Sequence, residues 1–431
     1  MRLARMILAI SMLALMPASY AFSATAIRFG QLVDGTGKVT KNAIIVVDGE
    51  RIKSVGTSAA DIPPNSEIID LSKYSGIPGL INVHTHAAGP AGCAACALPQ
   101  RSPVEMMFIR GQANARKSIE MGVTTIRDLG AVGFMDIAMR NLINSGDMFG
   151  PRMFVSGPGM RPARMFSPPM ATPTTYPNQA PEATADSPDE VRQVVRRLAA
   201  AGVDVIKMFG STGAAADVSG TQTFTFEEMK AGVETAHELG LKIAIHSYGF
   251  SGARDAVLAG ADSLEHGPIL DDATIREMVK RGTFYDPTVD HNRNPFGRPV
   301  VVGDPIWTFG DNTFKTVQRA IKAGVKFVMG VDGAADQFVS TEIPYTRNAT
   351  RELIWYVKAG MTPTQALAAA TINPAALLGK EKELGKVEPG FFADIVAVEG
   401  DPLKDVDVTV TKVRWVMKAG KVMVDQTKES K

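Results

Sequence analysis

The 431-residue sequence is poor in cysteine and carries almost no excess charge of either sign. Its 2 cysteines cannot build a disulfide framework, and a chain of this length buries enough surface to fold without one. The 46 lysines and arginines nearly balance the 45 aspartates and glutamates, so nucleic acid is not an expected partner. A hydrophobic content of 45% with 21% charged residues excludes a disordered chain.

An apolar segment stands at the N-terminus. Residues 1–21 contain Arg2 and Arg5, then an apolar run over residues 6–16, then small residues up to Ala21. This order is typical of a secretory signal peptide, and the run is too short for an ordinary transmembrane helix. We therefore expect cleavage after Ala21, a secreted or periplasmic chain and no stable membrane insertion. The alternative is an uncleaved membrane anchor.

Both ends of the chain show short, β-like segments. Asp48-Gly49 separates two apolar runs, which is a strong hairpin signal, and the segment over residues 411–424 turns at Ala419-Gly420 in the same way. These patterns predict one small β-sandwich domain built from residues 26–75 and 385–427.

Between these segments, residues 76–384 alternate between strand and helix patterns. Capping boxes at Ser187, Thr225 and Thr362 mark helix starts. No Gly-x-Gly-x-x-Gly sequence follows the first strand, which argues against a dinucleotide-binding sheet. Near-continuous apolar strands favour an α/β fold of the closed (β/α)8 TIM-barrel type over an open doubly wound sheet. The expected strands are Pro78–His84, Val123–Asp128, Arg152–Ser156, Val203–Met208, Lys242–His246, Ser263–His266, Thr283–Pro287 and Lys326–Asp332.

Two histidines stand at the end of the first of these strands. His84 and His86 are two residues apart on an extended segment, so both side chains leave the same face. Barrel enzymes place their sites at the carboxyl ends of the strands, and neighbouring imidazoles are usually held there by a divalent metal ion. Taken alone, the pair could equally be two surface loop histidines.

Four more polar residues take the same relative position in later β/α units. Lys207 lies in an apolar strand, where an unpaired ammonium is costly, so it must be ion-paired, neutral or chemically changed. His246, His266 and Asp332 each end a strand. Any one of them could be a satisfied polar group of the core. Together with the histidine pair they indicate a single metal centre.

The whole pattern resembles the amidohydrolase superfamily. Its binuclear members carry His-x-His on strand one, a carboxylated lysine on strand four, histidines on strands five and six, and aspartate on strand eight. Similar segments here are GIPGLINVHTH, MGVTTIRDLG, ADSLEHG, GVDG and the C-terminal LGKVEPGFFADIVAVEGDPL. The segments HSYG and TFYDPTVDHNR are similar to the imidazolonepropionase-like branch, which includes Xaa-Pro dipeptidase-like enzymes, carboxypeptidases and ochratoxin hydrolases.

The resemblance implies two divalent ions in this chain, expected to be zinc. It also implies that Lys207 is carboxylated by carbon dioxide to N6-carboxylysine and bridges the two ions. A hydroxide between the ions would be the nucleophile, and Asp332 would accept its proton and return it to the leaving amine. The implied ligands are His84, His86 and Asp332 for one ion and His246 and His266 for the other. A homo-oligomer is implied as well, with an octamer as one candidate.

Three further residues are candidates for contacts to the substrate. Tyr248, two residues past His246, is placed to donate to the developing oxyanion, or else is a packed loop tyrosine. His291 and Arg293 follow the seventh strand and could hold a substrate carboxylate, or else belong to a polar surface loop. Arg127, near the end of the second strand, is equally well explained as a structural ion-pair partner.

Cys93 and Cys96 form a Cys-x-x-Cys sequence in the loop after the histidine pair. A thioredoxin-like role needs this motif at a helix start in its own fold, and two thiols alone make a weak metal site. A disulfide between the two, formed in an oxidising compartment, is the preferred interpretation.

Together these features predict a secreted, metal-dependent amidohydrolase. Its expected substrate is a small molecule, a dipeptide or an N-acyl amino acid with a free carboxylate, aryl-acyl amino acids of the ochratoxin type included. One alternative is hydrolysis of cyclic amides, lactones or organophosphates at the same metal centre. An alternative of another class is a catalytically inactive binding protein on the same fold.

Overall fold

The structure, a computed structural model, describes residues 24–87, 104–131, 133–163, 181–213, 220–293, 305–333 and 350–428. The predicted signal peptide and the predicted pair of Cys93 and Cys96 lie outside these residues. Within the described ranges, no helix has both the length and the apolar character needed to cross a membrane.

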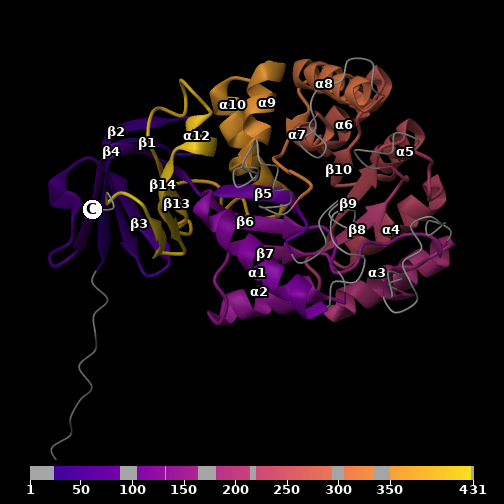
Figure 1. The fold of residues 1–431 in the computed structure, drawn as a ribbon, viewed down its shortest axis with the longest axis horizontal. Coiled ribbons are helices and arrows are strands. Elements are labelled where there is room, and N and C mark those ends of the chain that lie inside the picture. Colours follow the sequence, from indigo (N-terminus) through magenta and orange to yellow (C-terminus); the bar gives the residue numbers. More distant parts are fainter. Residues whose placement is uncertain are drawn as a thin grey trace, which may run out of the picture.

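Strands from both ends of the chain form one seven-stranded sheet, at the left of Figure 1. Its order is β15-β14-β13-β4-β1-β2-β3, and the two halves join where β4 pairs antiparallel with β13. The hairpins expected at Asp48-Gly49 and Ala419-Gly420 are confirmed. The strand bounds are β1 (Thr25–Val33), β2 (Val39–Asp48), β3 (Arg51–Gly56), β4 (Glu67–Pro78), β13 (Ile395–Val398), β14 (Val413–Lys418) and β15 (Lys421–Asp425).

This sheet wraps around an apolar core of its own. Its outer strand β3 meets the segment before β13, where the backbone N–H of Ile52 donates to the carbonyl of Phe391 at 2.9 Å. The core is built from apolar side chains, so the hydrophobic effect is its main source of stability. They include Ile27, Phe29, Leu32, Ile45, Leu71 and Trp415.

The central part of the chain contains two parallel sheets, and the expectation of an α/β fold is confirmed. Isolated parallel bridges, Met160–Met208 and Thr85–Gly333, lie at the two gaps between the sheets. All the predicted strands are present, but the last ends at Phe327 instead of Asp332. The cause is that Met329 leaves the ladder and donates its N–H to Ala369 at 2.7 Å. One sheet holds β5 (Leu80–Thr85), β6 (Val123–Asp128) and β7 (Arg152–Val155); the other holds β8 (Val205–Phe209), β9 (Lys242–Ser247), β10 (Ser263–His266), β11 (Phe284–Asp286) and β12 (Lys326–Phe327).

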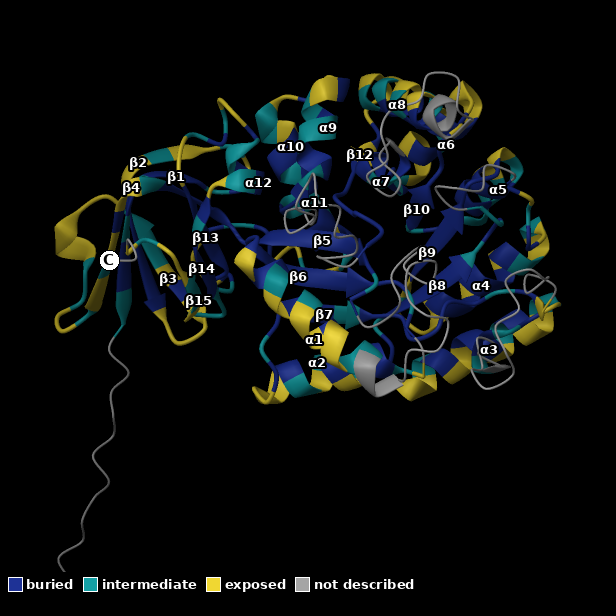
Figure 2. Cartoon of the chain, in the orientation of Figure 1, coloured by how far each residue is buried: buried dark blue, intermediate teal, exposed yellow. Residues whose placement is uncertain are grey.

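Helices follow the strands and cover their outer side (Figures 1 and 2). Thr225 and Thr362 head complete capping boxes, as predicted. At Ser187 the box is only half formed, because the carboxylate of Glu190 accepts from the N–H of Asp186 instead. The helices are α1 (Val104–Glu120), α2 (Met135–Ser145), α3 (Pro188–Ala201), α4 (Phe226–Glu238), α5 (Phe250–Ala259), α6 (Asp272–Arg281), α7 (Val289–Arg293), α8 (Pro305–Ala323), α9 (Glu352–Ala359), α10 (Pro363–Ala369), α11 (Ile372–Leu377) and α12 (Val408–Thr411). Short 3-10 helices cover Ala59–Asp61 and Pro181–Ala183.

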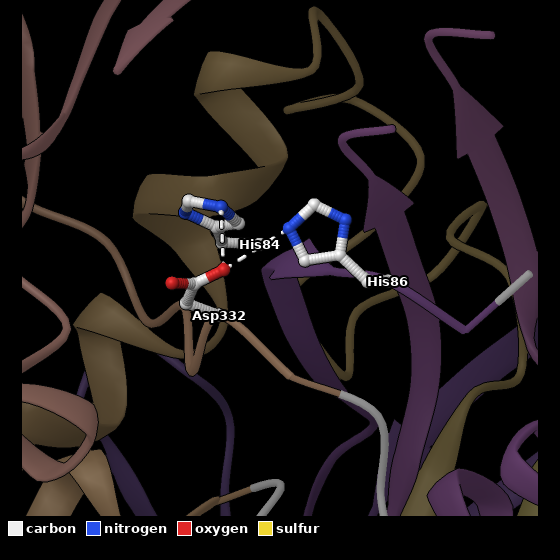
Figure 3. A group of neighbouring side chains, drawn as sticks. All are labelled: His84, His86 and Asp332. Atoms are coloured by element: carbon white, nitrogen blue, oxygen red, sulfur yellow. Dashed lines mark hydrogen bonds and ion pairs between the residues drawn. The ribbon is translucent and has the colours of Figure 1, made fainter. Parts of the chain in front are cut away.

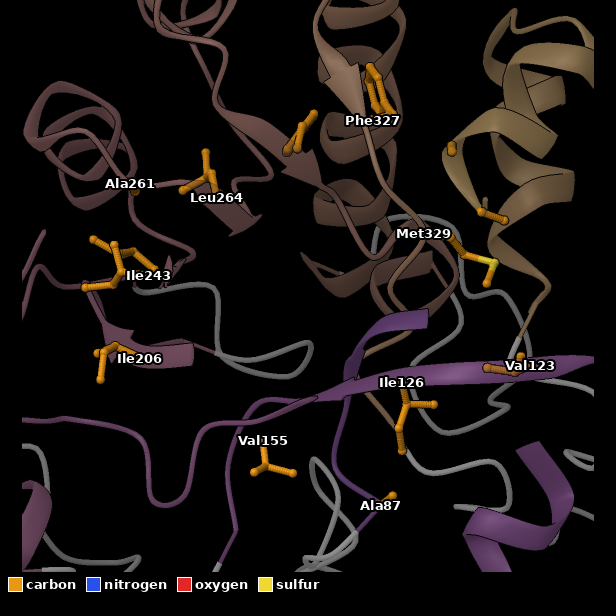
Figure 4. Packing of buried hydrophobic residues seen from close by; sticks show 14 of the residues in the cluster. Ala87, Val123, Ile126, Val155, Ile206, Ile243, Ala261, Leu264, Phe327 and Met329 are labelled. Carbon is orange, nitrogen blue, oxygen red and sulfur yellow. The ribbon is translucent and has the colours of Figure 1, made fainter. Parts of the chain in front are cut away.

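The main core lies between the parallel strands and these helices. Figure 4 shows buried apolar side chains on consecutive strands, from Val123 and Ile126 on β6 to Phe327 on β12. The strands are buried while the helices expose one side, as Figure 2 shows. This packing fixes the strands, so that residues at their carboxyl ends are held on a rigid frame.

Candidate metal centre

The polar residues predicted as metal ligands come together at the carboxyl ends of the parallel strands. His84 lies in β5, Lys207 in β8, His246 in β9 and His266 in β10, and Asp332 follows β12. These five residues are buried: three of them are 1% exposed, and Asp332 is 9% exposed. His86, which follows β5, is half-buried, with 16% of its side chain exposed. Polar side chains in such a place need hydrogen-bond partners or a ligand.

Asp332 is the point at which four imidazoles meet. Its Oδ1 lies 3.0 Å from Nε2 of His86 and 3.3 Å from Nε2 of His84, as Figure 3 shows. Its Oδ2 lies 3.3 Å from Nε2 of His291 and 3.8 Å from Nε2 of His266. Burial would lower the pKa of His86, but the hydrogen bond to Asp332 and the charges of Asp332 and Asp128 together outweigh it and raise that pKa. The rings therefore present the same nitrogen to one carboxylate.

Backbone strain accompanies this convergence. The φ angle is 70° at His266 and 48° at Asp332, in the left-handed region that side chains rarely occupy. Residues in such regions cost about 1–3 kcal/mol each and gather at functional sites. The strand ends are thus held in place by the surrounding structure and not by local preference.

On the far side of the rings, Nδ1 has partners of its own. Nδ1 of His86 lies 3.3 Å from the carbonyl oxygen of Gly130, and Nδ1 of His266 lies 2.7 Å from the hydroxyl oxygen of Thr288. A proton held on Nδ1 by such an acceptor leaves the Nε2 lone pair available to a metal ion. Both rings are therefore oriented as metal-binding histidines are.

The side chain of Lys207 is buried in the centre. Its Nζ has no hydrogen-bond partner within the described ranges and lies 5.4 Å from the ring centroid of Phe209. Burial lowers the pKa of Lys207 to about 8, so a share of the amine is neutral near that pH. Nε2 of His246 also lacks a hydrogen-bond partner in this part of the chain. Both atoms can therefore take a further partner.

Burial and neighbouring charges set the protonation of the centre. Burial, and next the charge of Lys207, lower the pKa of His84 to about 4. Burial lowers the pKa of His246 and of His266 well below the usual value too. It would raise the pKa of Asp332, but the neighbouring histidines outweigh it and hold that pKa well below its usual value. Neutral imidazoles and an ionised carboxylate are the forms that bind cations.

The residues predicted to contact substrate lie on the same side. The ring of Tyr248 is buried, with its centroid 4.5 Å from that of His266, and its hydroxyl donates to Oδ1 of Asn292 at 2.8 Å. His291, in α7, is only 18% exposed and faces Asp332, so it is not a surface residue. Arg293 ends α7, and its side chain lies outside the described part.

Sequence reasoning missed a buried group of charges behind His84. Nδ1 of His84 lies 2.9 Å from Oδ2 of Asp286 and 2.9 Å from Oε2 of Glu265. Arg127, 1% exposed, pairs with Glu265 at 2.8 Å, which confirms its interpretation as a structural ion-pair partner. Burial, then the charge of Glu265, raises the pKa of Asp286 well above its usual value. The available signal was an acidic residue inside each of two apolar strands.

The donor set fits a divalent metal ion. Within the described part, two triads have ligand atoms close enough to share an ion, one of them His84, His86 and Asp332. Imidazole nitrogen and carboxylate oxygen are the ligands that zinc and similar ions take, and four Nε2 atoms around one carboxylate supply them. The second triad is His84, Glu265 and Asp286.

Comparisons with known proteins agree with this centre. A family model described as "Amidohydrolase family" matches residues 77–423. Ochratoxinase of Aspergillus niger is 29% identical, over 92% of this chain and 86% of its own length. A solved Xaa-Pro dipeptidase with bound methionine has a TM-score of 0.82 and 30% identity, covering 93% of this chain and 99% of that one. The solved A. niger ochratoxinase has a TM-score of 0.78 and 27% identity, covering 94% and 96%.

The chain therefore belongs to the amidohydrolase family. It is a hydrolase that acts on carbon–nitrogen bonds of the amide type, related to ochratoxinase and to dipeptidases.

Proposed function

We propose that this chain is a binuclear metal-dependent amidohydrolase. The observation that carries the proposal is the meeting of imidazole Nε2 atoms at Asp332, beside a buried Lys207 that has no hydrogen-bond partner in the described ranges. A centre of this kind is costly to build unless a cation and an anionic ligand complete it.

We propose that residues 76–384 form a closed (β/α)8 barrel that carries this centre. The bridges Met160–Met208 and Thr85–Gly333 support it, since they link the two parallel sheets at both gaps. Residues 26–75 and 385–427 would form a separate β-sandwich domain.

When bound, two divalent ions, zinc in the first instance, would activate water and polarise the scissile carbonyl. Lys207 would join them as a carbamate: its neutral amine adds to carbon dioxide, a nitrogen–carbon bond forms and one proton is released. The lowered pKa of Lys207 supports this step, because only the neutral amine is nucleophilic. The proposed ligands are His84, His86 and Asp332 for one ion, His246 and His266 for the other, and Lys207 for both.

Asp332 would carry the proton of the reaction. It is ionised, because neighbouring histidines hold its pKa low, so it can take a proton from the attacking water. It would then return that proton to the leaving nitrogen. Tyr248 would donate its hydroxyl to the developing oxyanion, which requires the hydroxyl to turn away from Asn292.

The proposed substrate is a dipeptide or an N-acyl amino acid with a free carboxylate. The relatives named ochratoxinase and Xaa-Pro dipeptidase support this class. His291 would contact the carboxylate from its place beside Asp332, and Arg293, two residues on, would complete the contact.

We also propose that residues 1–21 are a signal peptide, that Cys93 and Cys96 are bonded in the secreted or periplasmic protein, and that the chain forms a homo-oligomer. Intact-mass measurement of protein from a secreting host tests the first two. Light scattering tests the third.

A substrate panel tests the proposed function. The zinc-loaded protein is assayed with dipeptides, N-acyl and aryl-acyl amino acids, the same compounds with an amidated carboxylate, hydantoin-type rings, lactones and phosphotriesters. We expect hydrolysis of the first group and at least about a tenfold loss on amidation, since an arginine–carboxylate contact is removed. Preferred turnover of rings or phosphotriesters would contradict the substrate class. No turnover by a metal-loaded protein would favour a binding role.

A further inference from the structure

Behind the proposed centre lies a buried group of charges that the mechanism does not use. Oε1 of Glu265 accepts from Nη2 of Arg127 at 2.8 Å and from the hydroxyl of Ser263 at 2.5 Å. Nη1 of Arg127 donates to Ser263 at 3.0 Å, and its Nε donates to the carbonyl of Val83 at 2.6 Å. Arg127 in β6 thereby ties β5 and β10 together.

This group ends on one nitrogen of His84. Oδ2 of Asp286 and Oε2 of Glu265 each lie 2.9 Å from its Nδ1. Asp286 reaches this place because residue 330 is glycine: a Cβ on Gly330 would collide with the Asp286 carboxylate. The segment after β12 thus keeps a space for a carboxylate from β11.

His84 differs in this respect from the other histidines whose Nδ1 partners are known. Nδ1 of His86 meets a backbone carbonyl and that of His266 meets a hydroxyl, both neutral oxygens. A carboxylate on Nδ1 fixes the tautomer and orientation of a histidine and makes Nε2 a stronger metal ligand. Of these three histidines, His84 therefore has the partners that fix its ring most firmly.

His84, Glu265 and Asp286 could themselves surround a cation, since their ligand atoms lie close together. Arg127 argues against this, because its guanidinium already gives Glu265 a positive partner at 2.8 Å. The group is better explained as support for His84.

We propose that Asp286 and Glu265, held by Arg127 and Ser263, are positioning residues for His84. They hold its Nδ1 and so set the affinity for the ion that His84 shares with His86. The inference rests on the proposed function, because it requires an ion at His84.

Zinc titration against a chromophoric chelator tests the proposal, with two stepwise dissociation constants measured for the wild type. Asp286→Asn keeps the shape of the side chain but removes the carboxyl group that faces Nδ1 of His84, and should weaken one constant by about 10–100-fold. Thr288→Val is the matched control, because it removes the Nδ1 partner of His266. It should weaken the other constant and leave the first unchanged.

Ser263→Ala gives a milder variant that loosens Glu265, and should weaken the same constant as Asp286→Asn by a few-fold. It keeps the test informative if circular dichroism shows that Asp286→Asn does not fold. The proposal is overturned if these variants change neither constant by more than about twofold, or if they act on the same constant as Thr288→Val. A wild type that binds no zinc overturns the proposed function as well, which separates the two failures.

Discussion

Lys207, which is buried, and Lys418, which is half-buried, show how the β/α centre differs from the sheet of the terminal strands. Burial lowers the pKa of both to about 8. Nζ of Lys418, in β14, donates to the carbonyl oxygen of Gly150 at 2.7 Å and so ties the sheet to the β/α part. Nζ of Lys207 has no hydrogen-bond partner in the described ranges. The fold gives Lys418 a hydrogen-bond partner, whereas the described residues give Nζ of Lys207 none.

The surroundings of the two lysines differ in the same way. The sheet has an apolar core around Trp415, which is 1% exposed. The centre instead buries Arg127, Lys207 and Glu265, each at most 1% exposed, together with several histidines. Apolar burial stabilises a fold directly, while buried charges do so only in complete networks. The sheet therefore stabilises the fold directly, while the buried charges belong to the centre for which we propose a catalytic role.

Among the variants, Lys207→Ala should have the largest effect on the proposed centre. We expect loss of bound metal and a fall of amide hydrolysis to the rate of the uncatalysed control, because the proposed bridging ligand is gone. Short carboxylic acids such as formate should restore part of the activity by taking its place. Metal analysis and rate measurement check both.

Lys418→Ala is the matched control for that variant, because it removes the other lysine whose pKa burial lowers to about 8. It should keep full metal content, and any loss should be of thermal stability. Wild-type metal content and rate in Lys207→Ala would refute the bridging role.

Tyr248→Phe should come next in effect. If its hydroxyl stabilises the oxyanion, kcat falls by about 10²–10³-fold with metal content unchanged. Tyr356→Phe is the control, because it also removes a buried tyrosine hydroxyl, one that donates to the carbonyl of Val328. Equal losses of kcat in the two variants would assign Tyr248 a purely structural role.

Trp415→Ala tests whether the sheet of the terminal strands contributes stability independently of the proposed centre. It should cost about 3–5 kcal/mol of unfolding free energy, because it leaves a large cavity in the core of the terminal sheet. Denaturant unfolding measures the loss. Metal content and kcat per folded molecule should not change, and a changed zinc affinity would show that the two regions are not independent.

The smallest expected effect is the change of thermal stability with pH that Lys418 causes. Its folded-state pKa of about 8 lies below the unfolded value of 10.5, so between these values the unfolded chain binds more protons. Stability from this residue should therefore increase as the pH rises from 8 to 10.5. We expect the Tm of the wild type, relative to Lys418→Met, to increase by roughly 2–4 °C over this range. An unchanged difference would show that Lys418 is not desolvated.

Most of the strands could be predicted from the sequence, and so could the grouping of the metal-ligand candidates at one end of the parallel strands. These predictions were possible because apolar strand runs alternate with capped helices, and His84, His246 and His266 stand at strand ends. The position of a residue at a strand end can be recognised from its own segment, and the parallel arrangement of the strands then brings such residues close together.

The support for His84 could not be predicted in this way. Glu265 and Asp286 are acidic residues within apolar strands, and their partner Arg127 lies 138 residues from Glu265. Whether a buried carboxylate is paired depends on neighbouring strands and not on its own segment. The same holds for Met329, whose contact with Ala369 ends β12 early.

The metal content of the purified wild type tests the central claim most directly. After reconstitution with zinc and bicarbonate and removal of excess metal, elemental analysis should give two ions per chain, lost in Lys207→Ala and kept in Lys418→Ala. A wild type that retains no divalent metal after this treatment would contradict the account.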